Sequence, residues 1–188
     1  NIKKICFLNV SLKTLSKFRN TDVSNELTPL RDVNYFKWRV LKSPFKKKYM
    51  IKTAIIGASG FIGSHLIQKY KSKYPDCIGT TFSSDKKNLL KFDLRNPDIK
   101  SLDLERTGHK AVIITSYKVN IPYCENEPRK AHEVNVEGML QLIKNLSQTS
   151  LKIIFLSSEY VFDGNQGKYS DNHPRAPDTA YGKHKKII

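Results

Sequence analysis

A glycine-rich turn directly after an apolar run constrains the fold of this chain more than any other feature. The run Lys52–Ile56 leads into Gly57-Ala-Ser-Gly60-Phe-Ile-Gly63, and an amphipathic helical pattern begins near Phe61. A strand that turns sharply into a helix needs residues without a Cβ where the backbone bends or is closely approached. The order of strand, glycine turn and helix therefore predicts a dinucleotide-binding βαβ unit, with the helix N-terminus facing a pyrophosphate.

Apolar runs and helical patterns alternate from Met50 onward, which is typical of βαβ units. The sequence therefore predicts an α/β fold, a Rossmann-type doubly wound parallel sheet. Because the last helical pattern is still running where the sequence stops, we expect this fold to be C-terminally incomplete. Strands are expected at Lys52–Ile56, Cys77–Phe82, Leu89–Phe92, Ala111–Thr115 and Lys152–Ser157, and helices at about Phe61–Tyr74, at about Arg129–Gln148 and from about Tyr181.

The first quarter of the chain differs in composition from the rest. Residues 1–49 hold nine lysines and three arginines against three acidic residues, and they show no sustained helical or strand period. We interpret residues 1–49 as a basic extension outside the fold, with a basic arm for a membrane or partner as the alternative. Residues 50–188 are expected to form the NAD(P)-binding domain, without a substrate domain.

The overall composition narrows the class of protein. The chain has 33 basic and 17 acidic residues, which favours anionic partners, but the charges interleave after Met50 without the basic stripe of a nucleic-acid surface. Three widely separated cysteines predict neither a zinc site nor a disulfide framework, and they favour the cytoplasm. No apolar run approaches the length of a membrane span. We therefore expect no metal, no nucleic acid and no membrane partner.

The end of the second strand commonly decides which nicotinamide cofactor is bound, because it meets the adenosine ribose. An acidic residue there binds the ribose diol, whereas hydroxyl and basic groups receive a 2′-phosphate. This chain has Ser83 and Ser84 in that region with Lys86 just beyond, and Asp85 comes slightly late for the diol. The pattern favours NADP(H) and leaves NAD(H) open, since these side chains also suit a solvated loop.

Acid–base chemistry is predicted where Tyr181 and Lys185 lie four positions apart, on one face of a helix. A tyrosine with its ordinary pKa near 10 is a poor acid–base group at neutral pH, and a neighbouring ammonium lowers that pKa. We therefore expect Lys185 to lower the pKa of Tyr181. The pair Ser157-Ser158 ends the fifth strand, at the sheet edge where such folds bind ligands, and Ser158 is the expected partner of a reacting carbonyl.

These motifs together resemble the extended short-chain dehydrogenase/reductase superfamily. The run Tyr160-Val-Phe-Asp-Gly164, together with Glu125-Asn-Glu-Pro128, resembles its dTDP-4-dehydrorhamnose reductase branch among nucleotide-sugar enzymes. Ser116 and Tyr117 depart from the family, in which two alanines are more usual. The resemblance implies that Ser158, Tyr181 and Lys185 are catalytic. The implied cofactor-binding residues are Gly57, Ser59, Gly60, Phe61, Ile62, Gly63, Ser83, Ser84, Lys86, Asp93, Leu94, Thr115, Ser116, Tyr117, Tyr181 and Lys185.

The resemblance implies NADPH-dependent reduction of a 4-keto nucleotide-sugar, with hydride transfer and a tyrosine as proton donor. Two alternatives stay open: an NAD-dependent nucleotide-sugar epimerase or dehydratase, and a non-catalytic NADP-binding regulatory subunit. The family pattern also implies that Asp93 contacts the adenine amino group, although an aspartate at a strand end is equally a turn residue. A nucleotide-sugar is the expected substrate, and a homodimer is left open.

Overall fold

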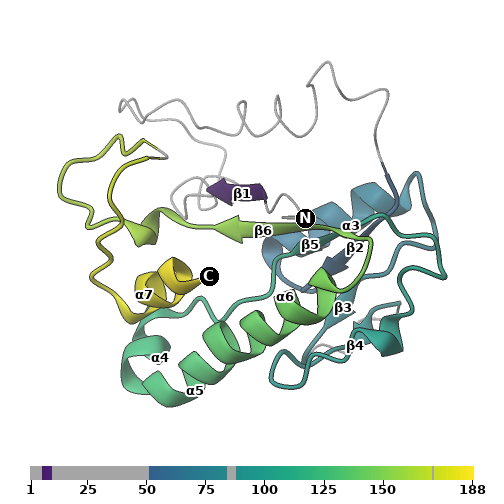
Figure 1. Cartoon of the computed structure of the whole chain (residues 1–188), viewed down its shortest axis with the longest axis horizontal. Coiled ribbons are helices and arrows are strands. Elements are labelled where there is room, and N and C mark those ends of the chain that lie inside the picture. Colours follow the sequence, from purple (N-terminus) through teal and green to yellow (C-terminus); the bar gives the residue numbers. More distant parts are fainter. Residues whose placement is uncertain (1–5, 10–50, 84–87, 171) are drawn as a thin grey trace, which may run out of the picture.

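A parallel β-sheet forms the centre of the molecule. The computed structural model describes residues 6–9, 51–83, 88–170 and 172–188. The main sheet has the order β1-β6-β5-β2, and all of its neighbouring strands run parallel (Figure 1). A parallel bridge between Ile55 and Gly79 joins β2 to the segment that enters β3, which pairs with β4. The strands are β1 (Cys6–Asn9), β2 (Thr53–Ile56), β3 (Thr80–Thr81), β4 (Leu90–Lys91), β5 (Ala111–Ile114) and β6 (Lys152–Ser157).

Helices connect these strands and cover both faces of the sheet. The α-helices are α3 (Phe61–Lys71), α4 (Ile121–Asn126), α5 (Pro128–His132), α6 (Met139–Ser147) and α7 (Ala180–Ile187). A π-helical segment, η4 (Glu133–Gly138), joins α5 to α6, and short 3₁₀ turns lie at η3 (Lys100–Leu102) and η5 (Glu159–Val161). Among the described residues, no helix is both long and apolar enough to cross a membrane.

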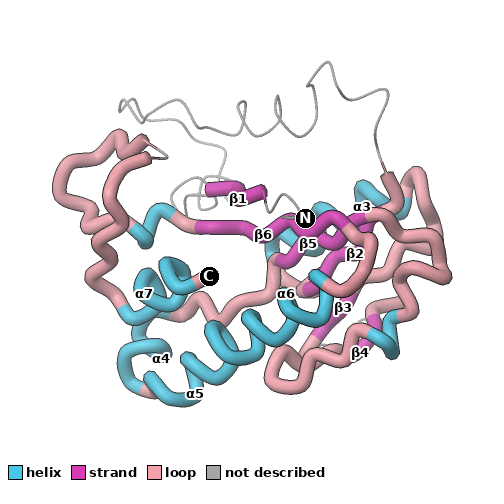
Figure 2. Tube along the Cα trace, in the orientation of Figure 1, coloured by secondary structure: helices cyan, strands magenta, loops and turns pink. Residues whose placement is uncertain are grey.

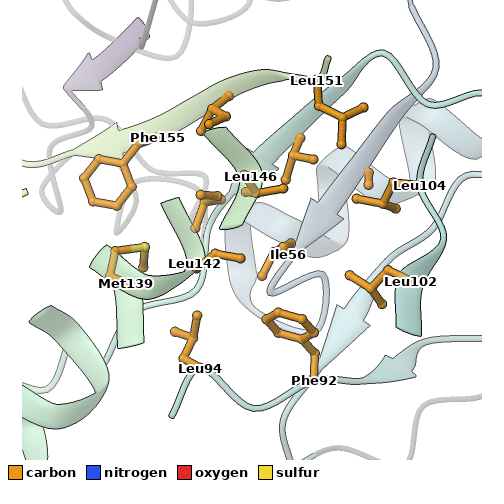
Figure 3. Close-up of a cluster of buried hydrophobic side chains, with 14 residues drawn as sticks. Ile56, Phe92, Leu94, Leu102, Leu104, Met139, Leu142, Leu146, Leu151 and Phe155 are labelled. Carbon is orange, nitrogen blue, oxygen red and sulfur yellow. The ribbon is translucent and has the colours of Figure 1, made fainter. Parts of the chain in front are cut away.

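The strand β2 shows how the sheet divides the core. Ala54 and Ile56 belong to a large buried cluster with residues of α6, whereas Ile55 packs on the other face with residues of α3. Side chains alternate between the faces of a strand, so a strand buried on both faces must be apolar throughout. The larger cluster also includes Met139, Leu142, Leu146, Leu151 and Phe155 (Figure 3). This core fixes β2, β5 and β6, whose carboxyl ends form the site described below.

The predicted α/β class and the five predicted strands are confirmed, but two strands are much shorter than expected. The second and third predicted strands reduce to two residues each, β3 and β4. The helix expected over Arg129–Gln148 forms one continuous helical stretch (Figure 2). Within it, the residues of η4 are π-helical. The last helix begins as predicted, because the Thr179 side chain accepts a hydrogen bond from Gly182 N–H.

Two features of the fold were not predicted from the sequence. The strand β1 pairs in parallel with β6, from Cys6 beside Ile154 to Asn9 beside Ser157. The helix α4 precedes the long helix, and its N-cap Asn120 accepts a hydrogen bond from Tyr123 N–H (2.7 Å). The strand β1 belongs to the segment that we expected to lie outside the fold, so residues 6–9 depart from that expectation. The domain boundary at residue 50 stays a prediction, because residues 10–50 lie outside the described residues.

Candidate active site

The predicted functional residues gather at the carboxyl ends of three neighbouring strands. The glycine-rich turn follows β2, residues 115–117 follow β5, and Ser158 follows β6. The helix α7 lies across the end of β6 and brings Tyr181 and Lys185 to the same place (Figure 1). This is the edge at which open parallel α/β sheets bind their ligands.

The glycine-rich turn has the close backbone contacts that the sequence predicted. Gly57 has a φ of +90°, and a Cβ there would lie 2.7 Å from the backbone nitrogen of Ser116. A Cβ at Gly63 would lie 2.8 Å from the Cα of Ala58. The turn then opens into α3, whose first turn carries no acidic side chain. The positive dipole end of this helix therefore suits a pyrophosphate.

Ser158 and Tyr181 are both buried and interact with each other. Ser158 is 3% exposed and Tyr181 is 4% exposed. Burial raises the pKa of Tyr181 to about 12, and the hydrogen bond to the Ser158 side chain offsets part of that rise. The next residue, Gly182, packs directly on the Tyr160 carbonyl, and a Cβ there would also lie 2.8 Å from the Pro177 side chain. Backbone contact therefore sets the position of Tyr181.

Lys185 is buried as well, but its ammonium does not act on Tyr181. Its Nζ donates to the Leu156 carbonyl (2.7 Å) and lies 3.7 Å from the centre of the Tyr117 ring. Burial lowers the pKa of Lys185 to about 7. The expected lowering of the Tyr181 pKa by Lys185 is wrong for this structure, because the ammonium is held elsewhere and burial dominates the phenol.

Asn135 fixes the loop that follows β5. This side chain is completely buried in η4; its Oδ1 accepts from Lys118 N–H (2.7 Å) and its Nδ2 donates to the Lys118 carbonyl (3.0 Å). Its Nδ2 also lies 3.5 Å from Nδ1 of His184 on α7. The asparagine therefore connects the π-helical segment, the loop and α7, and π segments of this kind are frequent at functional sites.

Residues 115–117 lie between the glycine-rich turn and α7. Thr115 donates from its backbone and its side chain to the Ile56 carbonyl (2.8 and 2.9 Å), and Ser116 lies against Gly57. The Tyr117 ring meets the Tyr181 ring edge-on, with 5.6 Å between centroids. The structure thus brings all three predicted loop residues to the site.

The residues expected at the adenosine end lie near β3 and β4. Ser83 is exposed after β3, whereas Ser84 and Lys86 lie outside the described residues. The Asp93 carboxylate is held by Arg95, whose Nη2 donates at 2.6 Å, and this pair keeps the pKa of Asp93 below its usual range. The Arg95 guanidinium also lies 5.2 Å from the centre of the Phe82 ring, which is 60% exposed. Sequence reasoning missed Arg95 and Phe82.

The remaining predicted residues take positions around the turn. Ser59 and Ile62 are half-buried, Phe61 is exposed at the start of α3, and Leu94 is buried behind Asp93. The site residues fit a dinucleotide, because Gly57 and Gly63 leave no room for a Cβ in the turn before α3, and residues 115–117 lead from that turn to Tyr181. A nicotinamide cofactor would lie from the Phe82 end to the Tyr181 end.

Comparison with known protein families agrees with this geometry. Residues 51–187 match the model of the family described as RmlD substrate binding domain. The chain belongs to this family. The match begins two residues before β2 and ends at the last residue of α7, so it includes every part of the candidate site.

Curated relatives cover the same region at low identity. The methionine adenosyltransferase 2 subunit beta of Pongo abelii is 22% identical over 134 residues, or 71% of this chain and 40% of that protein. A putative UDP-glucose 4-epimerase of Methanocaldococcus jannaschii is 29% identical (71% and 47%). A dTDP-4-dehydrorhamnose reductase of Aggregatibacter actinomycetemcomitans is 27% identical (72% and 45%). The chain therefore spans less than half the length of each of these relatives.

A solved structure supports the same assignment. The crystal structure of a hypothetical dTDP-4-dehydrorhamnose reductase from Sulfolobus tokodaii superposes with a TM-score of 0.65 at 27% identity. The match covers 73% of this chain and 50% of that one. The resemblance to the extended short-chain dehydrogenase/reductase superfamily and its dTDP-4-dehydrorhamnose reductase branch is thereby confirmed.

Proposed function

We propose that the whole protein reduces a keto group on a nucleotide-linked sugar with NADPH. The observation that carries this proposal is the burial of Ser158, Tyr181 and Lys185 together at the carboxyl end of β6, on the same sheet edge as the glycine-rich turn. The dTDP-4-dehydrorhamnose reductases among its relatives support this substrate class.

The protonation state of Tyr181 suits reduction. With a pKa raised to about 12, the phenol keeps its proton at neutral pH. In the proposed reaction the carbonyl carbon receives a hydride, which the nicotinamide supplies when bound, and the carbonyl oxygen receives the Tyr181 proton. The Ser158 hydroxyl, already bonded to Tyr181, is placed to hydrogen-bond that oxygen. The phenolate is then reprotonated from solvent.

The adenosine end supports NADP(H) as the preferred cofactor. Phe82 and Ser83, the first two residues after β3, offer no carboxylate to a ribose diol. Arg95 lies over the Phe82 ring with its side chain 47% exposed, and a nearby arginine is the usual means of accommodating a 2′-phosphate. Its bonds to Asp93 hold the guanidinium in a fixed plane and leave other N–H donors for a phosphate.

Two other functions are supported by particular relatives. An epimerase would fit the same trio and the putative UDP-glucose 4-epimerase relative. A regulatory subunit would fit the methionine adenosyltransferase 2 subunit beta. The complete buried trio favours catalysis, because a protein that only binds the dinucleotide has no need of a buried proton donor.

Cofactor titration and turnover of the whole protein separate these functions. NADPH and NADH are titrated separately by nicotinamide fluorescence, and NADPH oxidation is then followed with dTDP-4-dehydrorhamnose. Tighter NADPH binding with substrate-dependent oxidation is the expected result. Tighter NADH binding, with UDP-sugar epimerisation, would replace the reductase by the epimerase. Dinucleotide binding without turnover of either sugar would favour the regulatory subunit.

A further inference from the structure

The Tyr117 hydroxyl is buried but lacks the hydrogen bond that burial ordinarily requires. Its oxygen finds no partner among the residues that the structure describes. A buried hydroxyl without a partner costs free energy, so native structures rarely keep one without a reason. Burial also raises the pKa of Tyr117, so the group stays protonated and can donate as well as accept.

The contacts of the ring hold this hydroxyl in place. The Lys185 ammonium lies 3.7 Å from the centre of one face of the ring, and the rings of Phe155 and Tyr181 lie at centroid distances of 6.2 and 5.6 Å. The backbone next to the ring is fixed as well, because the Asn135 side chain hydrogen-bonds both the N–H and the carbonyl of Lys118. The hydroxyl cannot find a partner by a simple rotation of the ring, since the oxygen lies on the ring axis.

The place of Tyr117 in the fold indicates where the partner comes from. The preceding residue, Ser116, touches the glycine-rich turn, and Tyr117 touches Tyr181 and Lys185. A dinucleotide that has its pyrophosphate at the turn and its reacting ring at Tyr181 must cross residues 115–117. Only the nicotinamide half of the cofactor lies on that part of the path.

We propose that the Tyr117 hydroxyl hydrogen-bonds the nicotinamide half of the bound cofactor, a contact that an alanine at this position lacks. The inference rests on the proposed function and deepens it. It assigns this chain a side-chain contact to its cofactor where the family more usually has a small apolar residue. The ring face contacts the Lys185 ammonium, and the hydroxyl gains a hydrogen-bond partner on the nicotinamide half when the cofactor binds.

Tyr117→Phe in the whole protein tests the proposal, with Tyr70→Phe as the matched control. Tyr70 is a half-buried tyrosine on α3 whose hydroxyl is bonded to Thr53, away from the site. Dissociation constants are measured for NADPH and for 2′-phospho-ADP-ribose, which lacks the nicotinamide, and melting temperatures are measured without ligand.

The expected result has three parts. Tyr117→Phe weakens NADPH binding about fivefold, since one neutral hydrogen bond is lost, and leaves 2′-phospho-ADP-ribose binding unchanged. Without ligand it melts at the wild-type temperature or above, because an unsatisfied polar atom has been removed. Tyr70→Phe melts lower and binds both ligands as the wild type does.

Two results would overturn the proposal while leaving the proposed function intact. One is unchanged NADPH binding by Tyr117→Phe, and the other is an equal loss for NADPH and 2′-phospho-ADP-ribose, which would assign the hydroxyl to the fold or the turn. If the wild type binds neither ligand, the proposed function fails and this inference fails with it.

Discussion

The two ends of the proposed cofactor site are built in different ways. The proposed catalytic end consists of Ser158, Tyr181 and Lys185, which are all buried at the end of β6 and on α7. The adenosine end follows two strands of two residues each, and it presents Phe82 and Arg95 largely to solvent. Under the proposed function, the chemistry would depend on buried residues of the core, whereas cofactor selection would depend on surface side chains outside it.

The largest expected effect comes from the catalytic end. Tyr181→Phe removes the proposed proton donor, and we expect kcat for keto-sugar reduction to fall by about 10²–10⁴. The NADPH dissociation constant should stay near the wild-type value, because the ring and its packing remain. Steady-state kinetics and nicotinamide fluorescence measure the two quantities. Retained turnover would mean that another group supplies the proton.

The turn between the two ends is tested by a pair of glycine variants, which measure where in the turn a Cβ can be accommodated. A Cβ at Gly63 would overlap the backbone of the turn, whereas at Gly60 the nearest such atom, the Gly57 carbonyl oxygen, lies 3.4 Å away. Gly63→Ala should therefore lower the free energy of unfolding by about 1–3 kcal/mol and impair binding of either cofactor. Gly60→Ala should keep nearly wild-type stability in the same denaturant titration. Equal losses in both variants would contradict this account.

The adenosine end should affect selection without affecting the chemistry. Arg95→Gln removes the charge proposed for the 2′-phosphate, so NADPH should bind about tenfold more weakly while NADH binding changes little. Arg106→Gln is the control, because Arg106 is also an exposed arginine paired with an aspartate, Asp103. A similar loss for NADH would show that Arg95 supports the fold of this end rather than the phosphate.

The smallest expected effect is a dependence of folding stability on pH, and it comes from His109. His109 is buried, its Nε2 accepts from Ile78 N–H (3.2 Å), and burial lowers its pKa below the usual 6.5. Below pH 6.5 the unfolded chain therefore binds a proton that the folded protein does not, so stability falls as pH falls toward the lowered pKa. The loss is at most about 1.4 kcal/mol per pH unit.

Denaturant unfolding between pH 7.5 and 5.5 measures this dependence. In His109→Gln, the side-chain oxygen can still accept from Ile78 but does not titrate in this range, so the pH slope should become shallower. An unchanged slope would assign the dependence to another group.

Local patterns predicted those parts of the site that local geometry determines. The glycine turn and the start of the last helix near Tyr181 were predictable, because each depends on residues a few positions apart. The length of β3 was not readable, because the pairing of Thr80 and Thr81 with β4 involves the tertiary fold. Tyr181 and Lys185 lie on one helix, as their spacing predicted. The direction of the Lys185 side chain was not predictable, because it depends on the Leu156 carbonyl, 29 residues away.

The sequence alone mainly failed to predict contacts between segments that are distant in the chain. The bond between Asn135 and Lys118 and the stacking of Arg95 over Phe82 join residues more than ten positions apart. A helical asparagine and a surface arginine carry no signal of such partners in the sequence. The strand β1 was missed for a similar reason, since it pairs with β6 across more than 140 residues.

The seating of Gly182 on the Tyr160 carbonyl has a consequence for substrate range. Because this contact is between main-chain atoms, it holds Tyr181, the proposed proton donor, near the end of β6 with little dependence on the surrounding loop. Of the residues between Phe162 and Pro177, those that the structure describes lie in no helix or strand (Figure 2), so we expect changes there to leave Tyr181 in place. Under the proposed function, a change in this loop alone would then alter the sugar preference and leave the position of the proposed proton donor unchanged.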